Sequence, residues 1–92
     1  MLHPTTMNEP STLKEHELIC FGMIAEWAGG PRQQLTLPQG SCVADLRKAV
    51  QERWPQLANI TYQVAVDQRL ANEDTVLESA REIALLPPFA GG

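Results

Sequence analysis

SCVADLRKAVQERWP, residues 41–55, is the stretch that decides the fold. Its apolar residues recur every three or four positions, which is the spacing of one helix face. They are Val43, Leu46, Val50 and Trp54. Asp45 falls in the first turn, where the helix dipole favours an acidic side chain, and Ser41 or Cys42 starts the helix. Pro55 ends it because the residue before a proline disfavours the α region. We therefore expect one main helix that packs its apolar stripe on the core.

Short apolar or alternating segments flank this helix and are typical of strands. Before it lie the nearly continuous apolar run ELICFGMI (17–24), which suits an interior strand, and the alternating segment RQQLTLP (32–38). After it lie the alternating segment TYQVAVD (61–67) and the aliphatic segment EIALL (82–86). The polar stretch 68–81 is expected to be a loop-rich crossing with room for one short strand. These elements predict a sheet of four or five strands.

The connections carry turn residues and a few apolar side chains. Gly29, Gly30 and Pro31 are expected to break any regular structure after the first strand. Trp27 lies in that connection, and we expect it to pack back onto the core. In the crossing between the last two long strands, the expected apolar anchors are Leu70, Val76 and Leu77.

The order strand, strand, helix, strand, short strand, strand predicts an α+β fold. The helix follows a two-strand unit and leads to strands that return beside the first, which is the ubiquitin-like β-grasp arrangement. We expect a mixed four- to five-stranded sheet packed on one main helix. Residues 1–15 are polar and contain two prolines, so they are predicted to be a flexible extension. Residues 16–86 form the predicted β-grasp domain, and residues 87–92 form an extended Gly-Gly tail.

Composition excludes several classes of function. The 92 residues suffice for one domain, and the formal charge of −4 argues against nucleic-acid binding, which needs a clustered positive stripe. No stretch is long enough to cross a membrane, and the N-terminus lacks the apolar region of a secretory signal. We therefore expect a cytoplasmic protein with neither a nucleic-acid nor a membrane partner.

The few candidate nucleophiles and ligands do not form a site in the sequence. His3 and His16 have no partner at metal-ligand spacing, and no Cys–His or Ser–His–Asp set is indicated. Cys20 lies in an apolar run, and Cys42 lies at a predicted helix start. We expect no bound metal and no catalytic centre of the chain's own.

The tail is the informative part of the sequence. Pro87 and Pro88 cannot donate to a sheet ladder, so they end the last strand and stiffen the exit. Phe89 is the one large apolar side chain that follows, with the small Ala90 after it. Glycine has no Cβ, so the final pair can thread a passage too narrow for other residues.

The carboxylate of Gly92 suggests the chemistry. A carboxylate is a poor electrophile, but adenylation replaces a charged oxygen with a good leaving group. A sulfur nucleophile can then attack the acyl-adenylate and leave a thiocarboxylate on a slim arm. The pattern favours a carrier that delivers sulfur into another enzyme's pocket.

The ending IALLPPFAGG resembles that of the small subunit of molybdopterin synthase, in the ThiS/MoaD sulfur-carrier family. The resemblance covers about residues 17–92. ELICFGMIAEWAGG is similar to the family's first strand and turn, SCVADLRKAVQERWP to its helix and TYQVAVD to its third strand.

The resemblance implies the β-grasp fold and a non-catalytic, sulfur-donating role in molybdenum cofactor biosynthesis. It implies three partners: an ATP-dependent adenylating enzyme, a sulfurtransferase and the large synthase subunit. No cofactor is expected to be bound; ATP is used by the activating enzyme. Gly92 would carry the thiocarboxylate and Gly91 would give a slim approach. The residues that would line the partner's channel are Pro87, Pro88, Phe89 and Ala90.

The turn before the last strand departs from the family pattern. The family has an acidic–Gly–acidic turn there, whereas this chain has Ser79, Ala80, Arg81 and Glu82. The family often has Asn where this chain has Asp67. An alanine at positive φ would cost about 1 kcal/mol, so either the turn differs or the strain is tolerated.

Other functions remain open at this point. Carriers for thiamine thiazole or another thio-cofactor also end in Gly-Gly, but they tend to be shorter and to lack the double proline. A ubiquitin-like modifier would join Gly92 to lysines of target proteins, and a plain interaction domain would not use the tail at all.

The last strand offers two possible surfaces for a partner. Alternation places Ile83 and Leu85 on one side of the strand and Ala84 and Leu86 on the other. One pair is expected to be core and the other interface, with Phe21 as a further interface candidate. The alternation does not distinguish the two sides.

Overall fold

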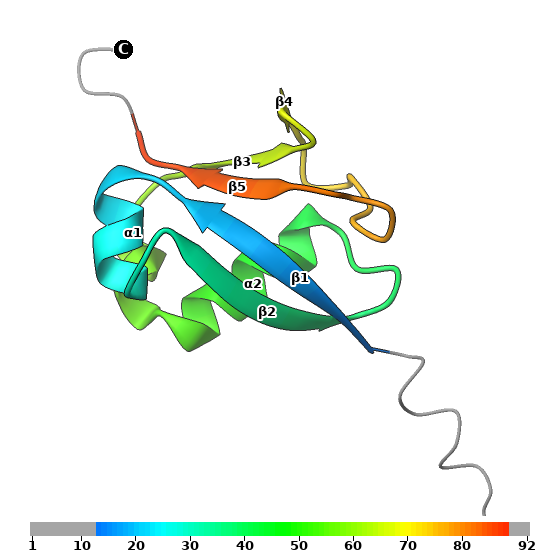
Figure 1. Cartoon of the computed structure of the whole chain (residues 1–92), viewed down its shortest axis with the longest axis horizontal. Coiled ribbons are helices and arrows are strands. Elements are labelled where there is room, and N and C mark those ends of the chain that lie inside the picture. The colour runs from blue at the N-terminus through cyan, green and yellow to red at the C-terminus, as the bar shows by residue number, and fades with distance from the viewer. Residues whose placement is uncertain (1–12, 89–92) are drawn as a thin grey trace, which may run out of the picture.

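The computed structural model describes residues 13–88, in which a mixed β-sheet carries a helix across one face (Figure 1). The elements are β1 Leu13–Cys20, α1 Gly22–Ala28, β2 Arg32–Pro38, α2 Val43–Arg53, the 3-10 helix η3 Pro55–Asn59, β3 Gln63–Val66, β4 Arg69–Leu70 and β5 Ile83–Leu86. The strand order is β2-β1-β5-β3-β4. The central strands β1 and β5 are parallel, and the other neighbours are antiparallel. The predicted α+β architecture, with a mixed sheet and one main helix, is confirmed.

The helix α2 has the boundaries that its sequence predicts. Its N-terminus is capped because Oδ2 of Asp45 accepts a hydrogen bond from the backbone N–H of Cys42 at 3.0 Å. It ends at Arg53, just before the Trp54–Pro55 pair. Three residues of its predicted apolar stripe have no exposed surface: Val43, Leu46 and Val50.

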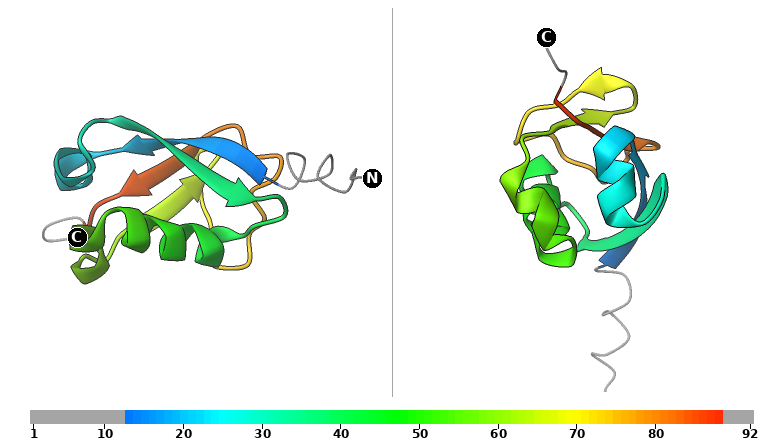
Figure 2. Two further views of the ribbon diagram at one scale, coloured as in Figure 1. Left: turned by 90° about the horizontal axis from the view of Figure 1, so that it is seen from below. Right: turned by 90° about the vertical axis from the view of Figure 1, so that its left-hand side faces the viewer.

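The helix α2 and the sheet enclose a single apolar core. Figure 2 shows α2 lying alongside the sheet. The strands supply side chains of alternate residues, namely Leu18, Cys20, Leu35, Leu37, Val64, Ile83 and Leu85. Fully burying one Leu or Ile side chain stabilises a fold by about 1.5–3 kcal/mol, so this face of the sheet holds most of the folding free energy.

The loop between β4 and β5 is attached to the start of α2. The backbone N–H of Leu77 donates to the carbonyl of Ser41 at 2.9 Å, and the Leu77 side chain is fully buried. Leu77 is therefore the anchor that the sequence predicts. Leu70 and Val76 are not anchors, because their exposed fractions are 64% and 54%.

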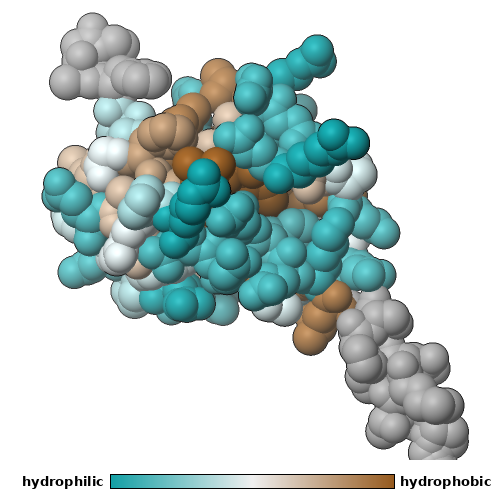
Figure 3. All heavy atoms as spheres, viewed as in Figure 1, coloured by the Kyte–Doolittle hydropathy of each residue, from teal (hydrophilic) through white to brown (hydrophobic). Residues whose placement is uncertain are grey.

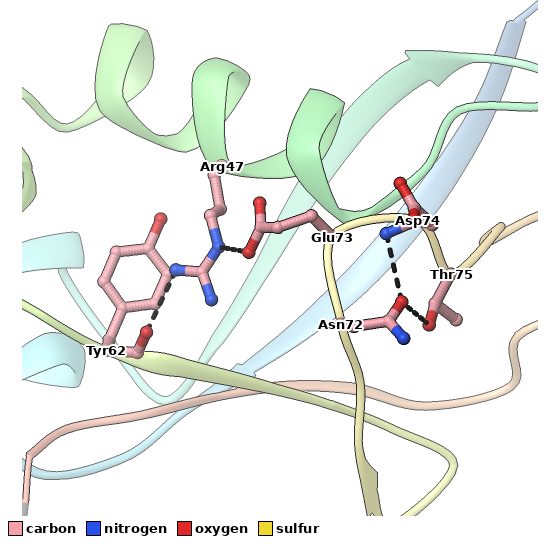
Figure 4. A network of polar contacts seen from close by, with 6 residues as sticks. All are labelled: Arg47, Tyr62, Asn72, Glu73, Asp74 and Thr75. Atoms are coloured by element: carbon pink, nitrogen blue, oxygen red, sulfur yellow. Dashed lines mark hydrogen bonds and ion pairs between the residues drawn. The ribbon is translucent and has the colours of Figure 1, made fainter.

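A polar network ties the same loop to α2 and to the start of β3 (Figure 4). Nε of Arg47 lies 2.7 Å from Oε2 of Glu73, and Nη1 of Arg47 donates to the carbonyl of Tyr62 at 2.9 Å. The Arg47 guanidinium also lies 4.9 Å from the centre of the Tyr62 ring. Within the loop, Oδ1 of Asn72 accepts from the Thr75 hydroxyl at 3.1 Å. These contacts fix the approach of the chain to β5.

The predicted first strand, 17–24, is wrong at both ends. The strand is β1, and it runs from Leu13 to Cys20 between β2 and β5, so only its interior position is confirmed. The helix α1 lies where the sequence predicts the end of the strand followed by irregular structure. The strand stops early because Gly22 has φ +56° and turns the chain away from the strand direction. Ile24 is fully buried in this helix, whereas Trp27 is 42% exposed and does not pack onto the core as predicted.

The predicted boundary after residue 15 is also three residues late. Leu13, Lys14 and Glu15 pair with Pro38, Leu37 and Thr36 in the β1–β2 ladder. They therefore belong to the domain and not to the predicted extension. Residues 1–12 lie outside the described part of the chain.

Candidate functional site

The root of the tail lies at the centre of the sheet. The strand β5 is hydrogen-bonded to β1 on one side and to β3 on the other. Pro87 and Pro88 follow it directly, and since proline has no N–H, the ladder ends there. Pro87 is half-buried and Pro88 is exposed. The tail therefore leaves from the middle of a rigid support.

The remaining predicted site residues lie outside the described part of the chain. They are Phe89, Ala90, Gly91 and Gly92. Their predicted roles in carrying sulfur and lining a partner's channel stay predictions, as do those of the two prolines.

The structure assigns the two faces of β5. Ile83 and Leu85 are 2% and 0% exposed and belong to the core beneath α2. Ala84 and Leu86 lie on the opposite face, where they help to line a groove. Ile83 and Leu85 are therefore the core pair, and Ala84 and Leu86 remain the candidate interface pair.

The groove on this opposite face has a volume of about 250 Å³. It is lined by Phe21, Ala65, Gln68, Leu70, Glu82, Ala84 and Leu86. Phe21 and Leu70 are 46% and 64% exposed, which is unusual for side chains of this size. Figure 3 shows hydrophobic spheres on the part of the surface that adjoins the root of the tail. An apolar groove thus adjoins the end of β5, directly before the start of the tail.

The sequence predicts only some of the residues that line this groove. It names Phe21, Ala84 and Leu86, but not the contribution of β3 and β4. Ala65 is the Cα partner of both Ala84 and Leu70, so these three residues share one face of three neighbouring strands. Alternation in TYQVAVD places Ala65 opposite Val64 and is the signal that could have found it.

The Asp67 carboxylate holds the backbone of the two residues that precede β5. Oδ1 of Asp67 accepts hydrogen bonds from the backbone N–H groups of Arg81 and Glu82, at 2.8 and 2.9 Å. These two bonds hold the pKa of Asp67 below its usual value, because they favour the charged form. Within residues 13–88, Asp67 and Gln68 are the non-glycine residues with positive φ. Ala80 therefore carries no such strain, and the turn differs from the family pattern.

The other reactive side chains are placed for structural roles. Cys20 is buried, and desolvation raises the pKa of its thiol, which lowers its reactivity. Sγ of Cys42 lies 3.4 Å from Asp45 at the start of α2. Among residues 13–88, no group of three or more His, Cys, Asp or Glu side chains could hold a metal ion. In the same residues no helix is both long and apolar enough to cross a membrane.

The fold and the tail root together define a class of protein: a ubiquitin-like β-grasp domain with a C-terminal arm that leaves beside an apolar groove. The chain belongs to the ThiS family, whose model matches residues 18–92.

Two similar proteins are molybdopterin synthase sulfur carrier subunits. The one from Caenorhabditis briggsae is 31% identical over 83% of this chain and 95% of its own length. The one from Homo sapiens is 33% identical over 83% of this chain and 92% of its own length. Among solved structures, small archaeal modifier protein 1 of Haloferax volcanii has a TM-score of 0.72 at 21% identity, over 82% of this chain and 98% of its own. That likeness shows the shared fold.

Proposed function

We propose that this chain is a sulfur carrier that serves as the small subunit of a molybdopterin synthase. The observation that carries the proposal is the exit of the tail from the central strand β5, directly beside the apolar groove. A partner that covers the groove would receive the tail in its own pocket. Membership of the ThiS family and the names of the similar proteins support the same role.

The chemistry takes place on the carboxylate of Gly92. The carboxylate attacks the α-phosphorus of ATP, which releases pyrophosphate and forms an acyl-adenylate. A sulfurtransferase supplies a persulfide sulfur that attacks the acyl carbon, and AMP leaves. A thiol then reduces the resulting acyl disulfide to the thiocarboxylate. In the synthase this sulfur attacks a carbon of the pterin precursor and displaces an oxygen substituent, which leaves with the electron pair of the broken carbon–oxygen bond. Water then cleaves the remaining acyl–sulfur bond, which leaves the sulfur on the precursor and restores the carboxylate.

The partners divide this work. We propose that the adenylating enzyme binds the ATP, so that the carrier needs no cofactor of its own, and that the large synthase subunit holds the precursor. Pro87, Pro88, Phe89 and Ala90 would line the channel that the tail enters. Gly92 has no side chain, which leaves its own acyl carbon unhindered, and Gly91 gives a slim approach. The cytoplasm is the expected location.

The intact mass of the chain tests the proposal. After incubation with ATP, a persulfide source and an adenylating enzyme, we expect a mass increase equal to exchanging one oxygen for one sulfur. A chain that lacks Gly91 and Gly92 should fold normally and show no increase. An unchanged mass, with an enzyme that is active on another carrier, would contradict the proposal.

The acceptor distinguishes the alternatives. Sulfur from the loaded chain should reach a pterin precursor on the large subunit, and not a thiazole precursor on a thiamine-pathway enzyme. Conjugates of higher mass on a denaturing gel would instead indicate a ubiquitin-like modifier.

A further inference from the structure

The junction between β1 and α1 supports the strand that leads into the tail. The backbone N–H of Phe21 donates to the carbonyl of Leu85 at 3.3 Å, which extends the contact between β1 and β5 by one step. Gly22 comes next and has φ +56°, a conformation that L side chains rarely adopt. The chain therefore makes a sharp turn directly beside the end of β5.

The missing side chain of Gly22 makes room for the tail root. A Cβ at Gly22 would lie 3.2 Å from Cγ of Pro87, closer than ordinary van der Waals contact. The half-buried Pro87 ring thus lies against the bare backbone of Gly22. Gly40 also has positive φ, +84°, but a Cβ there would meet nothing within 4 Å. A positive φ does not by itself bring a glycine close to a neighbour, so the contact between Gly22 and Pro87 is a separate feature of this site.

We propose that Gly22 is a positioning residue that sets the direction in which the tail leaves the sheet. Pro87 is the first residue beyond β5, and its ring fixes φ, so a shift of the ring changes the direction in which the backbone leaves the strand. We expect a shift of the ring at this point to change how the sulfur on Gly92 is presented to the partner. This inference rests on the proposed sulfur-carrier function.

Matched substitutions separate the contact from backbone strain. Gly22→Ala introduces a close contact with Pro87 and also backbone strain. Gly40→Ala introduces only backbone strain, because a Cβ there meets nothing within 4 Å. The assay is single-turnover transfer of sulfur from thiocarboxylated chain to the large subunit of a molybdopterin synthase. For Gly22→Ala we expect the rate at saturation to fall roughly tenfold, because misplacement of a reacting group costs rate. The Kd for the large subunit should change less than about threefold, and Gly40→Ala should alter neither quantity.

The proline provides a second comparison. In a Pro87→Ala background the ring is absent, so adding Gly22→Ala should lower the rate by less than about twofold. An equal loss in both backgrounds, an equal loss in Gly40→Ala, or a wild-type rate in Gly22→Ala would overturn the proposal. Urea denaturation of each variant measures its folding, so that rates are compared between folded chains.

A measurement on the free chain separates this inference from the function. Nuclear Overhauser contacts between the Gly22 Hα protons and the Pro87 ring should be present in the wild-type chain. Their absence would overturn the positioning role whatever the chain carries. If these contacts are present but the chain never accepts sulfur, the contact between Gly22 and Pro87 stands and the proposed function is contradicted.

Discussion

The two faces of the sheet are built from the same strands and behave in opposite ways. On the face beneath α2, Leu85 is fully buried. On the other face, Leu70 and Phe21 are 64% and 46% exposed around the groove. The covered face gains its free energy when the chain folds, whereas the open face can gain it only when a partner binds. The covered face is therefore core, and the open face, with exposed side chains from β4 and from the β1–α1 junction, is the surface that we propose for recognition.

The largest expected effect comes from the core between α2 and the covered face. Leu46→Ala should lower the free energy of unfolding by about 2–5 kcal/mol, because Leu46 is fully buried and leaves a cavity. Leu70→Ala on the open face should change it by no more than about 0.5 kcal/mol. Urea denaturation checks both values. Equal losses in the two variants would remove the distinction between the faces.

The second largest expected effect is weaker binding to the partner when the open face is altered. Leu70→Glu should weaken binding to the large synthase subunit by about 2 kcal/mol, or roughly thirtyfold in Kd, because it places a charge in the apolar groove. Val76→Glu is the matched control, since Val76 is 54% exposed and does not line the groove. Calorimetric titration measures both. Similar losses in the two variants would show that the groove is not the docking surface.

The smallest effect is a dependence of stability on pH, which originates on β1. His16 is 6% exposed, and burial together with nearby Lys14 lowers the pKa of its imidazole. His16 is protonated near pH 6.5 in the unfolded chain and only at lower pH in the folded chain. The free energy of unfolding should therefore fall as the pH drops below about 6.5. Denaturation from about pH 8 to about pH 5 should show this slope, and His16→Gln should reduce it. An unchanged slope in His16→Gln would assign the dependence to other groups.

The main helix and most strands are predictable because their patterns are local. The stripe of α2 has the helical period, and Pro55 marks its end without reference to the rest of the chain. The helix α1 is missed because it has only seven residues and follows an apolar run that is equally typical of a strand. The turn at Gly22 separates the two, and its place beside Pro87 at the end of β5 is a tertiary contact that no local pattern contains.

The site is predictable in its chemistry and only partly in its shape. The Pro-Pro and Gly-Gly residues of the tail indicate an activated carboxylate on a thin arm. The groove depends on strand order, because Ala65 and Leu70 meet Ala84 only after β3 and β4 have been placed beside β5. Phe21 is named from the sequence as an interface candidate, but its place in the wall of that groove needs the tertiary fold.

The parallel pairing of β1 and β5 has a consequence for engineering. Leu18 pairs with Ile83, so the start of β1 at Leu13 and the end of β5 at Leu86 are about eight residues of strand apart, or roughly 26 Å. A fluorophore or surface linker attached to the exposed Leu13 position would therefore lie at the end of the domain opposite Pro87. The protein can be immobilised or labelled there while its carboxyl end still reaches an enzyme.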